Sequence, residues 1–371
     1  RQEYARMIAE WETTGRQLPQ SHGAADLSVA ELISRYWLWV KSYYRHADGT
    51  PTKEVADMLY SLRPLNHLYG PTLVNDFGPI ALKSVRRLMI DGYDHRKYGP
   101  QAALSRGVVN QRVKRIRRMF KWGVEQEMVS ATVLQALQAV AGLKRGRTEA
   151  YDTEPVLPVS RAVVEDTLPL LRPQQADMVR LQLETGMRPG ELVMMRAIDI
   201  DMSGNVWLYR PGRHKTAHHG HQRIVPIGPK AQEIIRRYLT VDLQARLFSP
   251  KQNMEQRSAI LRIARRTKVQ PSQQNRRKNK PKKKPGPVYS VDAYRRGITE
   301  AIKRHNNGKP ENEHIPHWHP HQLRHLRALE LKREAGLDVA RAVLGHRSPC
   351  ITEHYATLDI ATAAEVMARI G

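Results

Sequence analysis

The chain has 371 residues, with 61 Lys and Arg against 36 Asp and Glu, so its formal net charge is +25. This length allows two domains with separate cores, and no apolar run approaches the roughly 20 residues needed to cross a bilayer. A single cysteine, Cys350, excludes an internal disulfide framework and is typical of a reducing, cytoplasmic compartment. The positive excess indicates a polyanionic partner, with nucleic acid first, although RNA or an anionic membrane would attract the same charge.

The first half of the chain predicts an all-α domain over residues 23–140, preceded by a polar lead over 1–22. Its first strong signal is a capping box in which Ser28 and Glu31 open a helix. Pro51 is expected at the first position of the next helix. Apolar residues at helical spacing predict further helices at about 79–90 and 105–128.

The helix predicted over 105–128 carries many cations beside its apolar stripe. There is no acidic residue between Ser105 and Val124. A charged face of this kind is ordinarily a solvated surface, but such a one-sided composition favours contact with DNA phosphates. The residues predicted to make that contact are Arg112, Arg115, Arg118 and Lys121.

The second half predicts a mainly α domain with a small antiparallel sheet. Residues 141–159, rich in glycine and proline, are expected to form an exposed linker to this domain, which spans 160–371. Two short alternating segments, Asn205–Arg210 and Arg223–Ile227, predict a β-hairpin. The expected helices are 160–171, 174–185, one beginning at Pro189, 230–239, 290–305, 321–334, 338–344 and 361–370, with Gly336 separating the pair before the last.

A basic insertion at about 251–288 stands out within this domain. No acidic residue lies between Glu255 and Asp292, and RRKNKPKKK at 276–284 has seven cations in nine positions. Neighbouring prolines and glutamines favour a flexible loop over a helix. A localisation signal or plain disorder would have the same composition. We interpret it as a tether to the DNA backbone, with Arg276, Arg277, Lys278, Lys282 and Lys283 as the contacting residues.

A set of side chains in the second half suits attack on a phosphodiester without a metal. Arginine is the best clamp for the phosphate oxygens, because its planar fork donates two hydrogen bonds and keeps its charge. A lysine can protonate the departing oxygen, and histidines can move protons or donate to the phosphate. A tyrosine nucleophile retains the bond energy in a phosphotyrosyl link, so strands can be rejoined without ATP. The candidates are Arg188, Lys215, His321, Arg324, His346 and Tyr355.

Two histidine clusters allow a zinc site as the weaker alternative. One contains His317, His319, His321 and His325, and the other His214, His218, His219 and His221. No cysteine pair accompanies them, and closed zinc sites usually show paired ligand spacing. We therefore predict no metal. His325 and Trp318 are expected to be core residues.

The candidate set resembles that of the tyrosine recombinase (phage integrase) family, which uses Arg, Lys, His, Arg, His or Trp, and Tyr in this order. The matching positions are Arg188 in TGMRPGEL, Lys215 on the hairpin, His321 and Arg324 as H-x-x-R, His346 in LGH, and Tyr355 as the nucleophile. Glu191 matches the acidic residue three positions after the first arginine. The resemblance extends over about residues 155–371, and residues 23–130 resemble the family's helical, SAM-like core-binding domain.

This resemblance implies a site-specific recombinase that cleaves and rejoins double-stranded DNA through a 3′-phosphotyrosyl intermediate, in integration, excision or inversion of a mobile element. It implies a homotetramer on paired sites, no cofactor, and no membrane association. It also allows for an accessory directionality protein and a location on the cytoplasmic nucleoid. Two alternatives stay open: a type IB topoisomerase-like enzyme, and a catalytically idle DNA-binding protein. Occupation of every catalytic position argues against the second.

Overall fold

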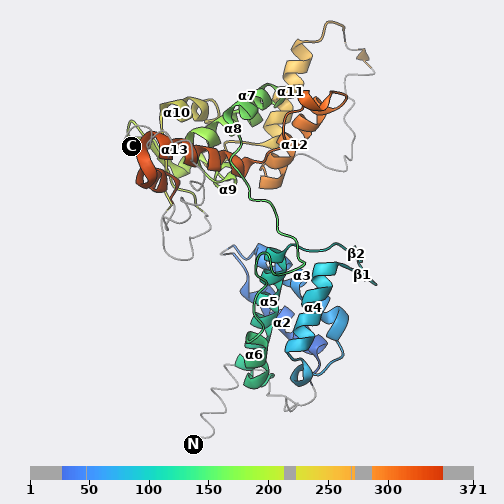
Figure 1. The fold of residues 1–371 in the computed structure, drawn as a ribbon. Coiled ribbons are helices and arrows are strands. Elements are labelled where there is room, and N and C mark those ends of the chain that lie inside the picture. Colours follow the sequence, from blue (N-terminus) through green and yellow to red (C-terminus); the bar gives the residue numbers. More distant parts are fainter. Residues whose placement is uncertain (1–26, 47, 213–222, 269, 272–285, 346–371) are drawn as a thin grey trace, which may run out of the picture. The chain divides into compact units, whose positions relative to one another are not determined.

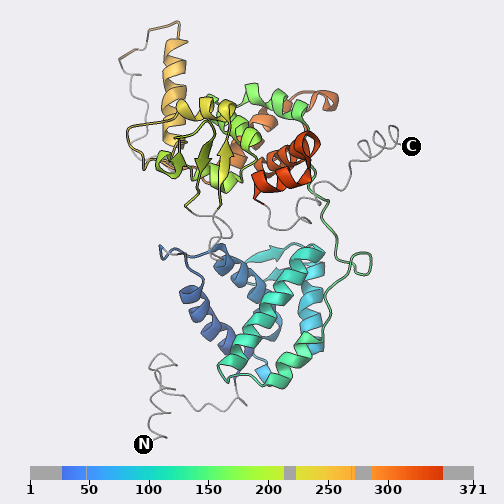
Figure 2. The ribbon, with the colours of Figure 1, turned by 90° about the vertical axis from the view of Figure 1, so that its left-hand side faces the viewer.

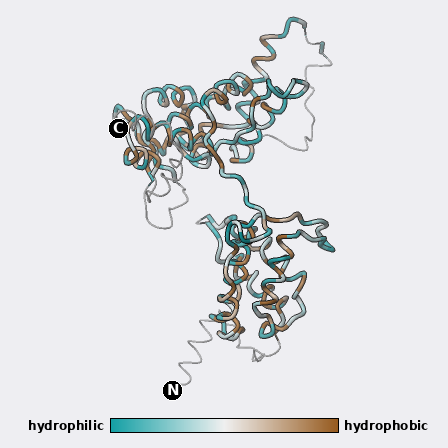
Figure 3. Tube along the Cα trace, viewed as in Figure 1, coloured by the Kyte–Doolittle hydropathy of each residue, from teal (hydrophilic) through white to brown (hydrophobic). Residues whose placement is uncertain are grey.

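The computed structural model describes residues 27–46, 48–212, 223–268, 270–271 and 286–345. The chain divides into two compact units between Glu154 and Pro155, inside the segment for which the sequence predicts a linker. Figure 1 shows the elements of each unit. Along the helices of both units, hydrophobic and hydrophilic residues alternate in short stretches, as expected for helices with one buried face (Figure 3).

The first unit is a helical bundle, as predicted. Its helices are α2 (Val29–Tyr43), α3 (Lys53–Tyr69), α4 (Pro79–Asp91), α5 (Arg106–Glu125) and α6 (Ala131–Gln138), with a 3₁₀ turn, η1, at Val74–Asp76. The long helix α5 packs against α3, and α2, α4 and α6 also contact it (Figure 2). Phe120 of α5 stacks on Phe77 with ring centroids 5.1 Å apart, in the core of this unit.

The start of α2 follows its local capping signal, whereas the start of α3 does not follow the proline signal. The predicted capping box is confirmed: the Glu31 carboxylate accepts from the Ser28 backbone N–H at 2.8 Å, and the Ser28 hydroxyl accepts from Glu31 N–H at 3.3 Å. The predicted start of the second helix at Pro51 is wrong, because α3 begins at Lys53 with Thr52 as its N-cap. A two-stranded hairpin, β1 (Tyr93–His95) and β2 (Gly99–Gln101), was not predicted, because strands of three residues carry too little alternation to be detected.

The first part of the segment predicted as a linker is held on α5. Asn110 both donates to the Leu143 carbonyl, at 3.0 Å, and accepts from the Leu143 N–H, at 2.8 Å. Arg106 forms an ion pair with Asp152 at 2.8 Å. The last part is held by the second unit, since Gln322 donates to the Leu157 carbonyl at 2.8 Å.

The second unit is mainly helical with a three-stranded antiparallel sheet in the order β3–β4–β5. Its elements are α7 (Arg161–Thr167), η2 (Leu168–Leu170), α8 (Pro173–Thr185), α9 (Pro189–Val193), η3 (Ala197–Asp199), β3 (Ile200–Asp201), β4 (Trp207–Tyr209), β5 (Val225–Ile227), α10 (Pro229–Arg236), α11 (Pro250–Ile263), α12 (Val291–Asn306), η6 (Glu311–Glu313) and α13 (Pro320–Leu344). The predicted hairpin is confirmed, with Tyr209 opposite Val225. Helix α8 lies at the centre, buried on nearly all sides, and packs against α13 and α10.

Two features of this unit bear on the sequence predictions. The residue Gly336, with φ 85° and ψ 172°, breaks α13 at the predicted position. The interpretation of 251–288 as a loop is wrong for its first part, because α11 occupies Pro250–Ile263. Pro250 fits the first turn of α11, and the next proline, Pro271, lies beyond the end of the helix. Because no proline interrupts residues 251–263, this part of the basic segment can form a helix.

Candidate active site

Arg188 lies at a sharp turn between the central helix α8 and the short helix α9. Gly186 ends α8 in the left-handed conformation, with φ 63°, and a β-carbon there would lie 2.6 Å from the Cδ2 atom of Leu344. Glycine is therefore required both by the backbone angle and by the close approach of α13. Arg188 follows as the N-cap residue of α9, with Pro189 at the first helical position.

Glu191 fixes the orientation of Arg188 from inside the first turn of α9. Its Oε2 atom accepts from the Arg188 backbone N–H at 2.9 Å, and its Oε1 atom accepts from Arg188 Nη1 at 2.7 Å. The carboxylate is 3% exposed, whereas the Arg188 side chain is 28% exposed. A partly accessible guanidinium is thus oriented by a buried carboxylate.

Burial raises the pKa of Glu191, but the positive charge of Arg223 and the hydrogen bonds from Arg188 outweigh it and leave the pKa below its ordinary value. Glu191 is therefore ionised at neutral pH. Tyr209 of β4 donates to the Glu191 backbone carbonyl at 2.8 Å, which anchors α9 to the sheet.

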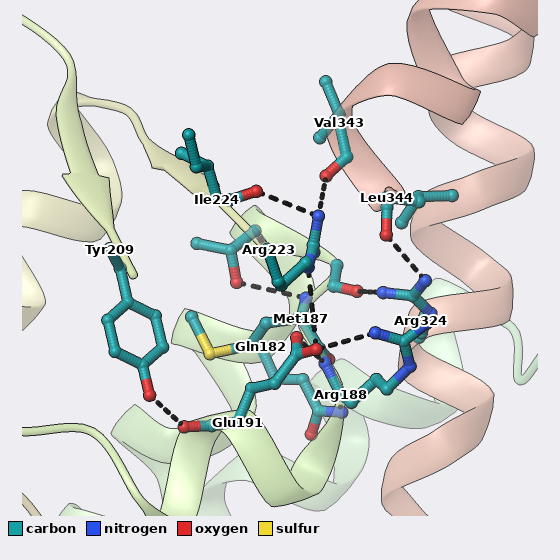
Figure 4. Close-up of polar contacts among 12 residues, drawn as sticks. Gln182, Met187, Arg188, Glu191, Tyr209, Arg223, Ile224, Arg324, Val343 and Leu344 are labelled. Carbon is teal, nitrogen blue, oxygen red and sulfur yellow. Dashed lines mark hydrogen bonds and ion pairs between the residues drawn. The ribbon is translucent and has the colours of Figure 1, made fainter. Parts of the chain in front are cut away.

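Arg324 joins the α8–α9 turn to the end of α13 (Figure 4). Its Nη1 atom donates to the Gly186 carbonyl at 2.7 Å, and its Nη2 atom donates to the Leu344 carbonyl at 2.8 Å. The residue is 1% exposed. The fold therefore brings Arg324 beside the turn that carries Arg188, although the two residues are far apart in the sequence.

His321 lies one turn before Arg324 on α13 and is exposed. Its ring meets that of His325 edge to face, with centroids 4.9 Å apart. His325 is buried, as predicted, and its Nδ1 atom lies 3.2 Å from the Val156 carbonyl oxygen, so Nδ1 carries the proton of that bond. Burial and, to a lesser extent, the charge of His321 lower the pKa of His325 to about 4, although the bond to Val156 opposes both.

The lowered pKa of His325 predicts a loss of stability in acid. An unfolded histidine binds a proton near pH 6.5, whereas folded His325 does so only near pH 4, so unfolding takes up a proton between these values. The contribution of His325 to stability is therefore fully present above the unfolded pKa, and the free energy of unfolding falls by about 2 kcal/mol between pH 7 and pH 5. Thermal melts of the whole chain at the two pH values should show this slope reduced in His325→Gln and retained in His314→Gln, an exposed histidine of the same unit. Equal slopes in the wild type and His325→Gln would contradict this assignment.

Two buried polar residues of the site were missed by sequence reasoning. Gln182 of α8 donates to the Met187 and Pro320 carbonyls at 3.1 and 2.9 Å and accepts from the Tyr294 hydroxyl at 3.1 Å. Arg223, just before β5, is 7% exposed. A signal for Arg223 was present, because strand alternation places it on the same face as Val225 and Ile227, which are both fully buried.

Several of the predicted site residues lie in parts of the chain that the structure does not describe. Lys215, His346 and Tyr355 lie outside the described residues, as do Arg276, Arg277, Lys278, Lys282 and Lys283. In the first unit, α3 supplies acidic partners for two of the predicted DNA-contacting cations of α5. Arg115 bonds Glu54 at 2.9 Å and Asp57 at 3.3 Å, and Arg118 bonds Glu54 at 2.8 Å. Contact of Arg112, Arg115, Arg118 and Lys121 with DNA stays a prediction.

The described residues offer neither a metal-binding cluster nor a membrane-spanning helix. Within the part of the chain that the structure describes, no group of three or more His, Cys, Asp or Glu side chains is arranged to hold a metal ion. Among the same residues, no helix is both long and apolar enough to span a membrane.

Solved structures define the class to which this fold belongs. A solved fragment of the Tn1549 transposon integrase, in complex with a circular intermediate DNA, matches 93% of this chain and all of the fragment, with a TM-score of 0.60 and 16% identity. A lambda integrase tetramer bound to a Holliday junction covers 95% of this chain and 85% of its own, with a TM-score of 0.54 and 13% identity. The fold is that of the integrase catalytic and core-binding domains.

Sequence comparison then identifies the family. The model of the phage integrase family matches residues 171–361. The tyrosine recombinase XerC of Bacillus pumilus is 23% identical over 283 residues, which are 76% of this chain and 78% of that protein. The chain belongs to the phage integrase family and is a tyrosine recombinase.

Proposed function

We propose that this recombinase cleaves one DNA strand at a time with Tyr355 as its nucleophile and Arg188 and Arg324 as the phosphate clamp. The observation that carries the proposal is the bond from Arg324 to the Gly186 carbonyl, two residues before Arg188. Through it, residues from distant parts of the sequence meet at one turn, in the order and types that the family uses.

The proposed reaction is a transesterification. The Tyr355 oxygen attacks phosphorus, the bond from phosphorus to the 5′-oxygen breaks, and a 3′-phosphotyrosyl bond forms. The tyrosine proton passes to His321, and Lys215 supplies a proton to the departing 5′-oxygen, which leaves as the 5′-hydroxyl. The arginines and His346 donate to the non-bridging oxygens, where charge develops in the transition state. Glu191 keeps Arg188 in place for this step.

We further propose that the chain acts as a homotetramer on paired sites in double-stranded DNA. The DNA-bound integrases of similar fold support this, including the lambda integrase tetramer on a Holliday junction. The net charge of +25 suits such a partner. A 5′-hydroxyl of the second DNA site would attack the phosphotyrosyl bond and rejoin the strand, as integration, excision or inversion requires. An accessory protein would set the direction of the reaction. Binding to DNA would place the protein at the nucleoid.

The test uses a DNA duplex that carries an end of the element and a nick just past the scissile phosphate. The short 5′-hydroxyl fragment diffuses away and traps the covalent complex. Wild-type protein, with EDTA present, is expected to give a covalent band on a denaturing gel, because the nucleophile is a side chain that needs no metal. Tyr355→Phe should give none, since it lacks the attacking oxygen.

The matched control is Tyr294→Phe, which removes a buried hydroxyl bonded to Gln182 and leaves the proposed nucleophile intact. It should retain the band. A band that persists in Tyr355→Phe would assign the nucleophile to another residue. Absence of a band in the wild type on the element's own ends would contradict the proposed cleavage.

A further inference from the structure

Arg223 is a buried cation that the proposed chemistry does not use. Its Nη1 atom donates to the Ile224 carbonyl at 2.9 Å and to the Val343 carbonyl at 3.1 Å, and its Nε atom lies 3.5 Å from the Glu191 carboxylate. These partners come from the hairpin, from the last turn of α13 and from α9 (Figure 4). One guanidinium therefore connects all three elements.

The first consequence concerns the charge on Glu191. This carboxylate, 3% exposed, is shared between Arg188 and Arg223, whose side chains are 28% and 5% exposed. Without Arg223, the full negative charge of Glu191 would act on Arg188 alone. The Glu191 carboxylate is shielded from solvent, and ion pairs are stronger in such a low-dielectric environment. Arg188 would then be held more tightly by Glu191 and would be a weaker donor to a phosphate.

The second consequence concerns the end of α13. The last carbonyls of a helix have no partner inside it. Here the Val343 carbonyl accepts a hydrogen bond from Arg223, and the Leu344 carbonyl accepts one from Arg324. Cations at this end also complement the helix dipole. Gly345 then turns away with φ 65°, and a β-carbon there would lie 2.4 Å from Arg223 Nη1. Arg223 thus packs directly against the residue at which the chain leaves α13.

We propose that Arg223 is a positioning residue for strand cleavage, which balances Glu191 so that Arg188 can bind the phosphate and holds the last turn of α13 in place. This inference rests on the proposed function. It assigns no contact with DNA to Arg223, so its loss should slow cleavage and leave DNA binding unchanged.

The test compares Arg223→Gln and Arg223→Lys with the wild type on the nicked duplex. Single-turnover formation of the covalent complex should fall about 10–100-fold in Arg223→Gln, because small displacements of positioned groups cost this much. DNA affinity, measured by fluorescence anisotropy, should stay within about twofold, since positioning, unlike a phosphate contact, leaves backbone binding intact. Arg223→Lys should recover part of the rate, because it keeps the charge beside Glu191 but lacks the planar fork. If Arg223→Gln does not fold, the cleavage rate and DNA affinity of Arg223→Lys alone test the proposal.

The matched control is Arg210→Gln, at the end of β4 on the other arm of the hairpin. Arg210 is 49% exposed and pairs with Asp201 at 3.6 Å, so its loss should leave the cleavage rate unchanged. A folded Arg223→Lys variant with the wild-type rate would overturn the proposal. An equal loss of affinity and rate would also overturn it, because it would assign Arg223 to DNA contact.

A double variant adds a readout that a purely structural role would not produce. If Arg223 acts through Glu191, the effects of Arg223→Gln and Glu191→Gln should not add, since neutralising Glu191 removes the charge that Arg223 balances. Additive losses would show that the two residues act separately. A wild type without covalent complex would contradict the proposed function itself, whereas an active wild type with active Arg223 variants would contradict only this inference.

Discussion

Replacing Arg324 with lysine is expected to reduce covalent complex formation by about 10²–10³-fold, the usual effect of losing a preorganised donor to a developing oxyanion. The guanidinium is 1% exposed and donates at once to the Gly186 and Leu344 carbonyls. A lysine retains the charge, but its single nitrogen cannot reproduce that fork. One carbonyl would be left without its partner, at about 1–3 kcal/mol. Single-turnover assays on the nicked duplex and thermal melts of the same samples would measure both effects.

The matched control for Arg324 is Arg327→Lys. Arg327 lies three residues further along α13, its side chain is 19% exposed, and it pairs with Glu330 at 3.3 Å. This variant makes the same chemical change on the same helix, but the Arg327 guanidinium does not bond the α8–α9 turn. Such an ion pair contributes only about 1 kcal/mol to stability, so the cleavage rate should stay within a few-fold of the wild-type rate. Equal losses in both variants would show that Arg324 acts only through the stability of α13.

Replacing Trp318 with alanine is expected to destabilise the second unit by about 3–5 kcal/mol, the usual cost of removing a fully buried tryptophan. Trp318 is 1% exposed, and its indole N–H donates to the Thr167 hydroxyl at 3.0 Å. It thereby anchors the segment before α13 to the end of α7. For a unit of this size the midpoint temperature of thermal unfolding should fall by about 6–20 °C. Thermal denaturation followed by calorimetry would record the change in the unfolding transition of this unit.

Two conservative variants separate packing from hydrogen bonding at this position. Trp318→Phe keeps much of the buried surface, and Thr167→Val removes the acceptor with little change in volume. Each should cost less than Trp318→Ala, and the double variant should cost less than the sum of the two, since both remove the same bond. A Trp318→Ala protein that melts with the wild type would refute the role of this residue as a core anchor.

Local signals predicted most of the helices correctly because their causes are local. The capping box at Ser28, the stop at Gly336 and the alternating segment at Arg223–Ile227 each depend on neighbouring residues. The strands β1, β2 and β3 were missed because two or three residues show no period, and they pair only when the partner strand is supplied. The helix α11 was missed because the basic composition of the whole segment was read as one loop.

The sequence by itself determined the family, since the types and order of Arg188, Lys215, His321, Arg324, His346 and Tyr355 can be read without coordinates, and the family model confirms membership over residues 171–361. Only the tertiary structure decided that Arg324 is buried between two backbone carbonyls and that Arg223 shares Glu191 with Arg188. The physical reason is that a charge can be buried only where partners are present. Here those partners come from the α8–α9 turn and from the end of α13, which are distant in sequence and meet only after folding.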